Sequence, residues 1–163
     1  VKFGADIPVC IRSSFQRMRG VGEKVKRLES NLRFYILLVN AGNQISTKLV
    51  FSRVEPKFRS KLDKLGRFRD LSDLIAYLKR QRNDLEEVAC NLDDNLKHVI
   101  TYLKKFSGCQ MVRLSGSGGT VFSIFESRNA AIEAYRKILV DKKYWWACYS
   151  LVNLADPGYD IIT

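Results

Sequence analysis

The chain has 163 residues, of which 46% are hydrophobic and 28% are charged, a balance typical of a globular protein with one well-formed core. No apolar run approaches the roughly 20 residues that a membrane-spanning helix needs, and the first residues lack the pattern of a signal peptide. The net charge of +11 favours anionic partners such as nucleotides, RNA or phosphorylated metabolites, without choosing among them.

The first thirty residues contain scattered glycines but no long hydrophobic period, and no regular element is assigned to them. The apolar run "RFYILLVN" (Arg33–Asn40), bounded by Gly42, predicts a buried strand. Ser46 is a candidate cap for a short helix in "NQISTKLVFSRV". The basic segment that follows, as far as Arg69, is interpreted as a surface excursion.

Three helices are expected next. Asp70 is a candidate cap for "DLSDLIAYLKRQ", and Asn83, with Glu86 at the capping-box spacing, for "NDLEEVACNL". The third, "DDNLKHVITYLKKFSG", is predicted to end at Gly108. It places four apolar residues on one face: Leu96, Val99, Ile100 and Leu103.

The last third of the chain predicts strands at 110–115 and 120–126, joined by a glycine-rich loop. Ser127 is a candidate cap for "RNAAIEAYRKIL", whose expected core face is Ile132, Tyr135 and Leu139. A final strand, "YWWACYSLV", is expected to bury Trp145 and Trp146.

Without the extra helices, the order of elements is strand, helix, strand, strand, helix, strand. This is the ferredoxin-like split βαββαβ pattern. The predicted fold class is therefore α+β, an antiparallel sheet with helices on one face.

Four cysteines are spread along the chain, and none of them forms a C-x-x-C pair. With a single histidine, His98, they do not match a familiar zinc site, so no metal site is predicted. We expect reduced thiols that pack as small hydrophobic side chains in a cytosol-like compartment. The four are Cys10, Cys90, Cys109 and Cys148.

Two segments could carry phosphate chemistry. In "SGSGGT" (115–120), small residues would let backbone N–H groups converge on an anion, although the alternative is a loose hairpin loop. The motif is neither a Walker loop nor a Rossmann fingerprint. In "FGADIPVC", Asp6 could accept the proton of a substrate hydroxyl, and the alternative is a cap or turn residue.

Two further segments could hold the rest of a ligand. Val21, between Gly20 and Gly22, would let the backbone approach a flat ligand, unless "GVG" is a plain turn. Thr47 could bind a polar group, and Phe51, four residues later on the same helix face, could stack on a base. A role of Phe51 in the hydrophobic core is equally open.

The order of five segments resembles the C-terminal half of the members of one kinase family. The segments are GAD-x-P, GVGE, VN-x-G-x-x-x-ST-x-x-VF, NDLE and SGSGGT. This family is the 4-diphosphocytidyl-2-C-methyl-D-erythritol kinase family of the GHMP kinase superfamily, and the similarity runs from Lys2 to about Val152. GAD-x-P and the glycine-rich loop are shared across the superfamily. The GVGE and VN-x-G-x-x-x-ST-x-x-VF segments point to this member.

The resemblance implies transfer of the γ-phosphoryl group of ATP, with Mg²⁺ on the nucleotide, to the C2 hydroxyl of a cytidine diphosphate substrate. This reaction belongs to non-mevalonate isoprenoid biosynthesis. The resemblance also implies that Asp6 is the catalytic aspartate, that Val21 lines the cytidine pocket, and that Thr47 and Phe51 bind the cytidine end. The motif near the phosphates would be Ser115, Gly116, Ser117, Gly118, Gly119 and Thr120. NDLE is interpreted as a helix start.

Two departures from the family accompany this resemblance. Ala41 stands where the family usually has proline, which loosens a turn but removes no chemical group. The family's N-terminal lysine and its P-x-x-x-G-L-G-G-G-S-S loop for ATP do not occur in these residues, and the chain begins with Val1. We therefore expect a fragment, inactive alone, in which 1–30 is a remnant of the ATP-binding domain and 31–163 is the substrate-side domain.

The expected partners are the small-molecule substrate and the N-terminal half of the same protein. No nucleic acid or membrane is expected as a partner. The expected protein is a monomer or homodimer in a bacterial cytoplasm. One alternative is a GHMP kinase for mevalonate or homoserine, which the GVGE segment disfavours. The other is a basic RNA-binding module, because such domains share the βαββαβ order. The strands "QMVRLS" and "TVFSIF" lack its aromatic pattern.

Overall fold

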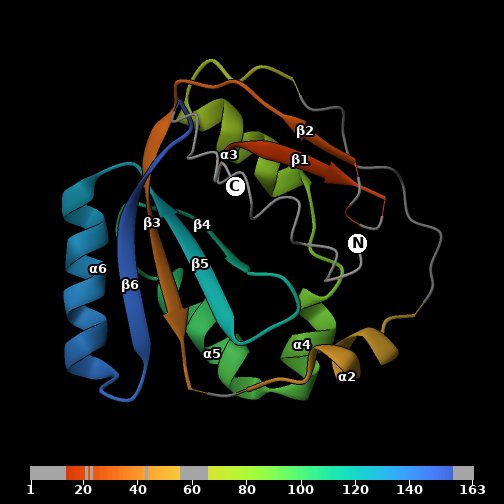
Figure 1. Cartoon of the computed structure of the whole chain (residues 1–163). Coiled ribbons are helices and arrows are strands. Elements are labelled where there is room, and N and C mark those ends of the chain that lie inside the picture. The colour runs from red at the N-terminus through yellow and green to blue at the C-terminus, as the bar shows by residue number, and fades with distance from the viewer. Residues whose placement is uncertain (1–13, 21, 23, 43, 56–65, 156–163) are drawn as a thin grey trace, which may run out of the picture.

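Four strands form one antiparallel sheet, which organises the molecule (Figure 1). The computed structural model describes residues 14–20, 22, 24–42, 44–55 and 66–155. Its elements are β1 (Gln16–Arg19), β2 (Lys24–Arg27), β3 (Arg33–Asn40), α2 (Thr47–Ser52), α3 (Leu71–Arg80), α4 (Glu86–Leu92), α5 (Asp94–Leu103), β4 (Cys109–Leu114), β5 (Thr120–Phe125), α6 (Arg128–Asp141) and β6 (Trp146–Asn153). The sheet order β4–β5–β3–β6 confirms the predicted ferredoxin-like α+β fold.

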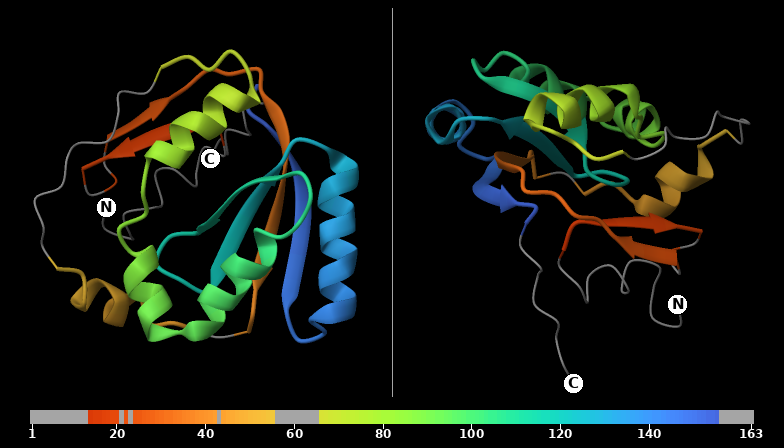
Figure 2. Two further views of the ribbon diagram at one scale, coloured as in Figure 1. Left: turned by 180° about the vertical axis from the view of Figure 1, so that it is seen from behind. Right: turned by 90° about the horizontal axis from the view of Figure 1, so that it is seen from above.

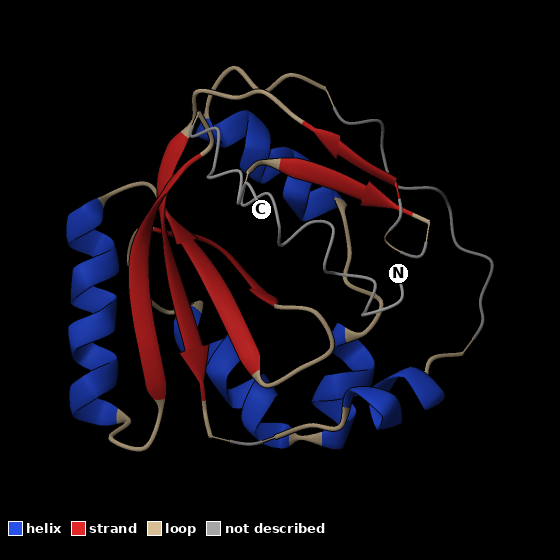
Figure 3. Cartoon of the chain, viewed as in Figure 1, coloured by secondary structure: helices blue, strands red, loops and turns tan. Residues whose placement is uncertain are grey.

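One face of the sheet supports the main hydrophobic core. Alternate side chains of a strand point to opposite faces, and Leu37 and Val39 of β3 are completely buried on this one. α5 and α6 pack against it, as the burial of Leu103 and Ile138 shows. In Figure 3, α6 lies alongside β6. α5 packs against β4 and β5. The predicted core face of α5 is confirmed in full.

The helix α3, one of the extra helices that the predicted pattern left out, packs against the opposite face of the sheet. α5 and α6 share one face, as the pattern predicted. Leu74 and Ile75 of α3 contact a smaller cluster formed by the alternate strand residues Phe34, Met111 and Ile124. Figure 2 shows α3 well separated from α6. The sequence of an amphipathic helix reveals that it has an apolar side, but not which face of a sheet receives it.

A two-stranded hairpin, β1 with β2, lies within the first thirty residues, to which no regular element was assigned. The strands are almost entirely polar, and only Met18 opposite Val25 forms an apolar cross-strand pair. Gly20 and Gly22 turn the chain with φ angles of 69° and 99°, which favour glycine. Hydrophobic alternation, the usual signal of a strand, is therefore nearly absent.

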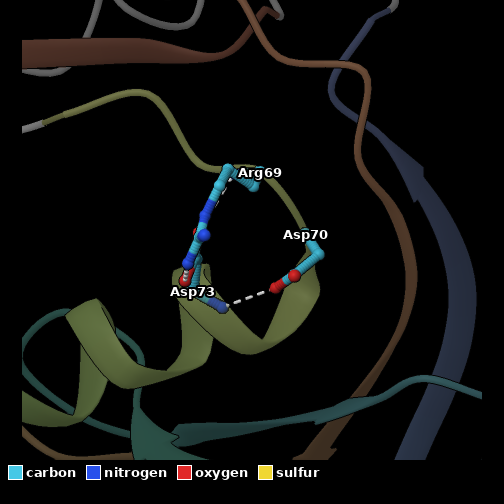
Figure 4. Close-up of polar contacts among 3 residues, drawn as sticks. All are labelled: Arg69, Asp70 and Asp73. Carbon is cyan, nitrogen blue, oxygen red and sulfur yellow. Dashed lines mark hydrogen bonds and ion pairs between the residues drawn. The ribbon is translucent and has the colours of Figure 1, made fainter.

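Three predicted helix caps are confirmed. Ser46, Asp70 and Ser127 each accept a hydrogen bond from the backbone N–H three residues later. At α3, Asp73 also forms a two-point ion pair with the exposed Arg69, at 2.7 and 3.1 Å (Figure 4). Hydrogen bonding to that guanidinium lowers the pKa of the Asp73 carboxyl.

The buried face of α6 differs from the predicted one. Ala131, Ala134 and Ile138 are completely buried, whereas Leu139 is exposed. Two alanines allow the helix to approach the sheet closely, and the larger residues beside them lie at the edges of the contact. α6 is the longest described helix, at 14 residues, and no helix in the described ranges is long and apolar enough to cross a membrane.

The two tryptophans before and within β6 have different environments. Trp145 packs edge-on against Tyr102, with ring centroids 5.5 Å apart, as expected for a core residue. Trp146 is 54% exposed, so its predicted burial is wrong.

Gly108 does not end α5, as was predicted, because that helix stops at Leu103.

The cysteines follow the prediction only in part. Cys90 is buried and Cys109 is half-buried, and burial raises the pKa of both thiols. Cys148 is exposed on β6, so it does not pack as a hydrophobic residue. Cys10 lies outside the described residues.

A polar contact joins the ends of α5 and α6. The Tyr102 hydroxyl donates a 2.9 Å hydrogen bond to Asp141, which also pairs with Lys137 at 3.3 Å. Burial and the carboxylate raise the pKa of Tyr102 to about 12. The hydrogen bond from Tyr102 and the Lys137 ammonium lower the pKa of Asp141.

We expect Tyr102→Phe to lower the midpoint of thermal unfolding by about 2–4 °C near pH 7, because it removes this hydrogen bond and keeps the ring. The depressed pKa of Asp141 stabilises the fold above about pH 4 and stops doing so as pH falls through the folded value. Tyr102 contributes below about pH 10 and loses its contribution as pH rises through about 12.

The measurement is a series of melting curves between pH 2 and pH 9. Tyr144→Phe is the control, because Tyr144 is 94% exposed. A deficit for Tyr102→Phe that stays equally large at pH 2 would contradict this account of the contact.

Candidate functional site

The glycine-rich loop, residues 115–119, connects the edge strand β4 to β5. Ser115 N–H donates a 2.9 Å hydrogen bond to the Thr120 carbonyl, which closes the base of the loop. Gly116, Gly118 and Gly119 have φ angles of 61°, 147° and 81°, values that strain any residue with a Cβ. The conformation of the loop therefore favours glycine at these three positions.

The start of α2 touches this loop. The Thr47 hydroxyl lies 2.8 Å from the Ser117 hydroxyl, and either oxygen can be the donor. A Cβ added at Gly118 would come within 3.2 Å of the Ile45 Cβ. Two segments separated by 70 residues, both predicted as ligand-binding from the sequence, thus meet in one place.

Asn40 organises the turn between β3 and α2. Its side-chain amide donates to the Thr120 hydroxyl at 3.3 Å, and its side-chain oxygen accepts from Gly42 N–H at 2.8 Å. The sequence analysis identified the VN-x-G segment but gave Asn40 no function. Its position at the end of an apolar strand, before a glycine, was the signal that could have revealed this contact.

Phe51 lies on α2 one turn after Thr47 and is 58% exposed. The alternative that Phe51 belongs to the hydrophobic core is therefore wrong. An exposed ring can stack on a flat ligand, so the proposed base-stacking role stays a prediction. The segment "NAGNQIST" brings Thr47 close to the loop, which places Phe51 one helical turn from the same site.

Asp6 and Val21, the predicted catalytic and cytidine-pocket residues, lie outside the described residues. Their roles stay predictions.

The NDLE segment differs from its prediction. α4 begins at Glu86, and its N-cap residue, Leu85, makes no side-chain cap hydrogen bond. The Asn83 side-chain oxygen accepts from Leu85 N–H at 3.0 Å, one residue before the helix. The Asn83 amide also donates to the carbonyls of Leu114, at 3.2 Å, and Gly116, at 2.8 Å. Glu86 accepts a 2.7 Å hydrogen bond from Leu114 N–H. The predicted capping box is therefore wrong, because both side chains bind the base of the glycine-rich loop.

The polar groups here suit binding of an anion more than a metal. In the described parts of the chain, no three histidine, cysteine, aspartate or glutamate residues gather as a possible metal site. The loop offers consecutive small residues, the serine and threonine hydroxyls, and backbone N–H groups that no Cβ shields. Such a surface can hold phosphate oxygens or the oxygens of a sugar.

Comparison with known proteins identifies the family to which the chain belongs. The family described as "GHMP kinases C terminal" matches residues 58–141, just over half of the chain. The match includes the NDLE segment, the glycine-rich loop and the strands that carry it. The chain belongs to this family.

Individual relatives narrow the likeness. The chain is 37% identical over 148 residues to a 4-diphosphocytidyl-2-C-methyl-D-erythritol kinase from Paracoccus denitrificans, covering 90% of this chain and 54% of that protein. It is 31% identical over 147 residues to the kinase of the same name from Roseobacter denitrificans, covering 90% and 49%. The chain spans about half the length of the curated relatives it matches.

Solved structures agree with the fold. A crystal structure of 4-(cytidine 5'-diphospho)-2C-methyl-D-erythritol kinase superposes with a TM-score of 0.72 at 25% identity, covering 93% of this chain and 55% of that one. A homoserine kinase from Cytophaga hutchinsonii gives a TM-score of 0.59 at 15% identity, covering 85% and 48%. The second similarity shows only that the fold is shared.

Alanine substitutions in the loop should separate backbone strain from steric conflict. Gly116→Ala meets no atom within 4 Å and should cost only the left-handed backbone penalty, about 1–2 kcal/mol. Gly118→Ala should cost more, because its Cβ also presses on Ile45. Gly66→Ala, in open space, is the neutral control. Urea unfolding measures all three, and equal losses at Gly116 and Gly118 would contradict the close packing against Ile45.

Proposed function

We propose that the protein phosphorylates the C2 hydroxyl of 4-diphosphocytidyl-2-C-methyl-D-erythritol with ATP, in isoprenoid precursor biosynthesis. The observation that carries this proposal is the 2.8 Å contact between Thr47 and Ser117, which joins the predicted cytidine-binding helix to the glycine-rich loop. Similarity to kinases named for this substrate supports the choice over other GHMP kinases. The homoserine kinase shares only the fold and does not favour that substrate.

The residues divide the substrate between them. Phe51, exposed on α2, stacks on the cytosine, Val21 lines the same pocket, and the Thr47 hydroxyl binds a polar group of the cytidine end. The loop from Ser115 to Thr120 presents backbone N–H groups to phosphate oxygens. Because these donors are positioned before the reaction, they stabilise negative charge without having to reorganise.

Asp6 acts on the acceptor hydroxyl. A carboxylate at hydrogen-bond distance orients that hydroxyl and accepts its proton as the new oxygen–phosphorus bond forms and the bond from the γ-phosphorus to the departing ADP breaks. ATP supplies the phosphoryl group, and Mg²⁺, carried by the nucleotide phosphates, offsets their charge. The described residues contribute hydroxyls and backbone N–H groups here, so they fit phosphate oxygens rather than direct ligation of the metal.

The whole enzyme needs more than these 163 residues. Residues 31–163 form the substrate-side domain, and residues 1–30 belong to an ATP-binding N-terminal domain. The lengths of the relatives support a longer whole protein, because they are about twice as long as the matched part. The described thiols are free, which suits the reducing bacterial cytoplasm.

A substrate panel tests the function. The complete protein, with ATP and Mg²⁺, is offered the cytidine diphosphate substrate, homoserine and mevalonate in separate assays. We expect turnover with the cytidine compound alone, and none from the 163-residue chain by itself. Turnover of homoserine or mevalonate at a similar rate would replace the proposed substrate, and ordinary turnover by the isolated chain would contradict the division into two halves.

The role of Asp6 is tested by Asp6→Asn in the complete protein. The amide cannot accept the proton, so kcat should fall by roughly 10²–10⁴-fold while KM for the cytidine substrate changes little. Asp94→Asn, an exposed change in the first turn of α5, is the control. If Asp6→Asn instead raises KM and leaves kcat intact, Asp6 acts in binding.

A further inference from the structure

We propose that Asn83 and Glu86 are positioning residues of the glycine-rich loop. They hold the base of the loop at Leu114 and Gly116, so that its backbone N–H groups keep one arrangement toward the substrate phosphates. The consequence for turnover rests on the proposed function, whereas the mechanical role depends only on the contacts below.

Leu114 lies on the outer edge of the sheet. β4 is the last strand of the four-stranded sheet and, among the described strands, pairs with β5 alone. Along such a strand, successive peptide groups point alternately toward and away from the partner. Ser115 N–H bonds to Thr120 of β5, so the N–H and C=O of Leu114 face outward. Leu114 is 1% exposed, which makes these outward groups costly to leave without partners.

Asn83 and Glu86 supply those partners from a single turn of chain. Glu86 accepts from Leu114 N–H at 2.7 Å, and Asn83 donates to Leu114 C=O at 3.2 Å. The same Asn83 amide donates to Gly116 C=O at 2.8 Å. The side chains of Asn83 and Glu86 therefore take the place of a neighbouring strand at the end of β4, with bonds to Leu114 before Ser115 and to Gly116 after it.

The chemistry of Asn83 explains why an amide stands there. Its side-chain oxygen accepts from Leu85 N–H at 3.0 Å, while its nitrogen serves the two carbonyls. This needs one acceptor and two donor hydrogens in one planar group, which asparagine has. Aspartate has a similar size but would place a carboxylate against two carbonyl oxygens.

A half-buried arginine stabilises the same segment. Arg113 donates to the carbonyls of Leu78 and Gln81, at 2.9 and 2.8 Å, and so fixes the end of α3 to β4. Burial lowers the pKa of Arg113, and the nearby Glu86 carboxylate opposes this shift. The connection between α3 and α4 is thus tied to β4 at Arg113, at Leu114 and at the start of the loop.

This anchoring matters because the loop alone is poorly constrained. Three of its five residues are glycines, which have the largest backbone freedom of any residue. Asn83 fixes the base at Gly116, and Thr47 meets the far part at Ser117. Donors held in this way are ready for a developing charge, whereas donors of a mobile loop would first have to be ordered.

The test compares Asn83→Asp, Glu86→Ala and Glu86→Gln in the complete protein. Asn83→Asp should speed amide hydrogen exchange of residues 115–119 by about tenfold or more. It should lower kcat by about 30-fold while KM for the cytidine substrate stays within about threefold. Glu86→Ala removes the acceptor for Leu114 N–H and should speed exchange in the same residues, whereas Glu86→Gln keeps an oxygen acceptor and should restore most of the protection. Asn129→Asp, exposed in the first turn of α6, is the matched control.

Each outcome decides the proposal. Unchanged hydrogen exchange in Asn83→Asp would overturn the anchoring, and faster exchange with unchanged kcat would overturn its importance for turnover. If the charge prevents folding, Asn83→Ala removes the same donors without adding one, and the same two readouts apply. If the wild-type protein does not phosphorylate the cytidine compound, the proposed function fails, and hydrogen exchange alone still decides whether Asn83 holds the loop.

Discussion

Between Leu114 and Val121 the chain must leave an edge strand, turn with positive φ angles at three glycines, and re-enter the sheet. Leu114 and Val121, which flank the loop, are 1% and 0% exposed, so both ends of the loop are anchored in the hydrophobic core. Leu114 has outward-facing peptide groups that a neighbouring strand would normally bind. The side chains of Asn83 and Glu86 bind them instead. The position of the glycine-rich loop therefore depends on two side chains that bind the unpaired edge of β4.

Several parts of the fold serve the same loop. The helix α3 is fixed at its end by Arg113. α4 begins at Glu86, whose side chain binds the base of the loop together with that of Asn83. From the opposite direction, Asn40 binds Thr120, and Thr47 meets Ser117. The loop is therefore held by residues from three separate parts of the sequence.

Elements whose signal is local were predictable from the sequence. The strand Arg33–Asn40 was predicted at its observed bounds, because a continuous apolar run between polar residues has few alternatives. The caps Ser46, Asp70 and Ser127 depend only on the next three residues. The βαββαβ order followed from these elements.

Features that depend on distant contacts were not predictable in this way. Asn83 and Glu86 have the spacing of a capping box, but a strand edge 28–33 residues away competes for the same side chains. The hairpin of β1 and β2 has almost no apolar alternation. The meeting of Thr47 with Ser117 required the sheet to bring the two segments together, although each had been singled out alone.

The central claim is that the start of α2 and the glycine-rich loop form one binding site for a cytidine diphosphate group. The most direct measurement is an NMR titration of the complete protein with cytidine diphosphate, following the Phe51 ring and the amides of Gly116, Ser117, Gly118 and Gly119. The account predicts that the ring and the loop amides shift together with a single dissociation constant, and that uridine diphosphate binds more weakly. Saturable binding that leaves both sets of signals unmoved would contradict it.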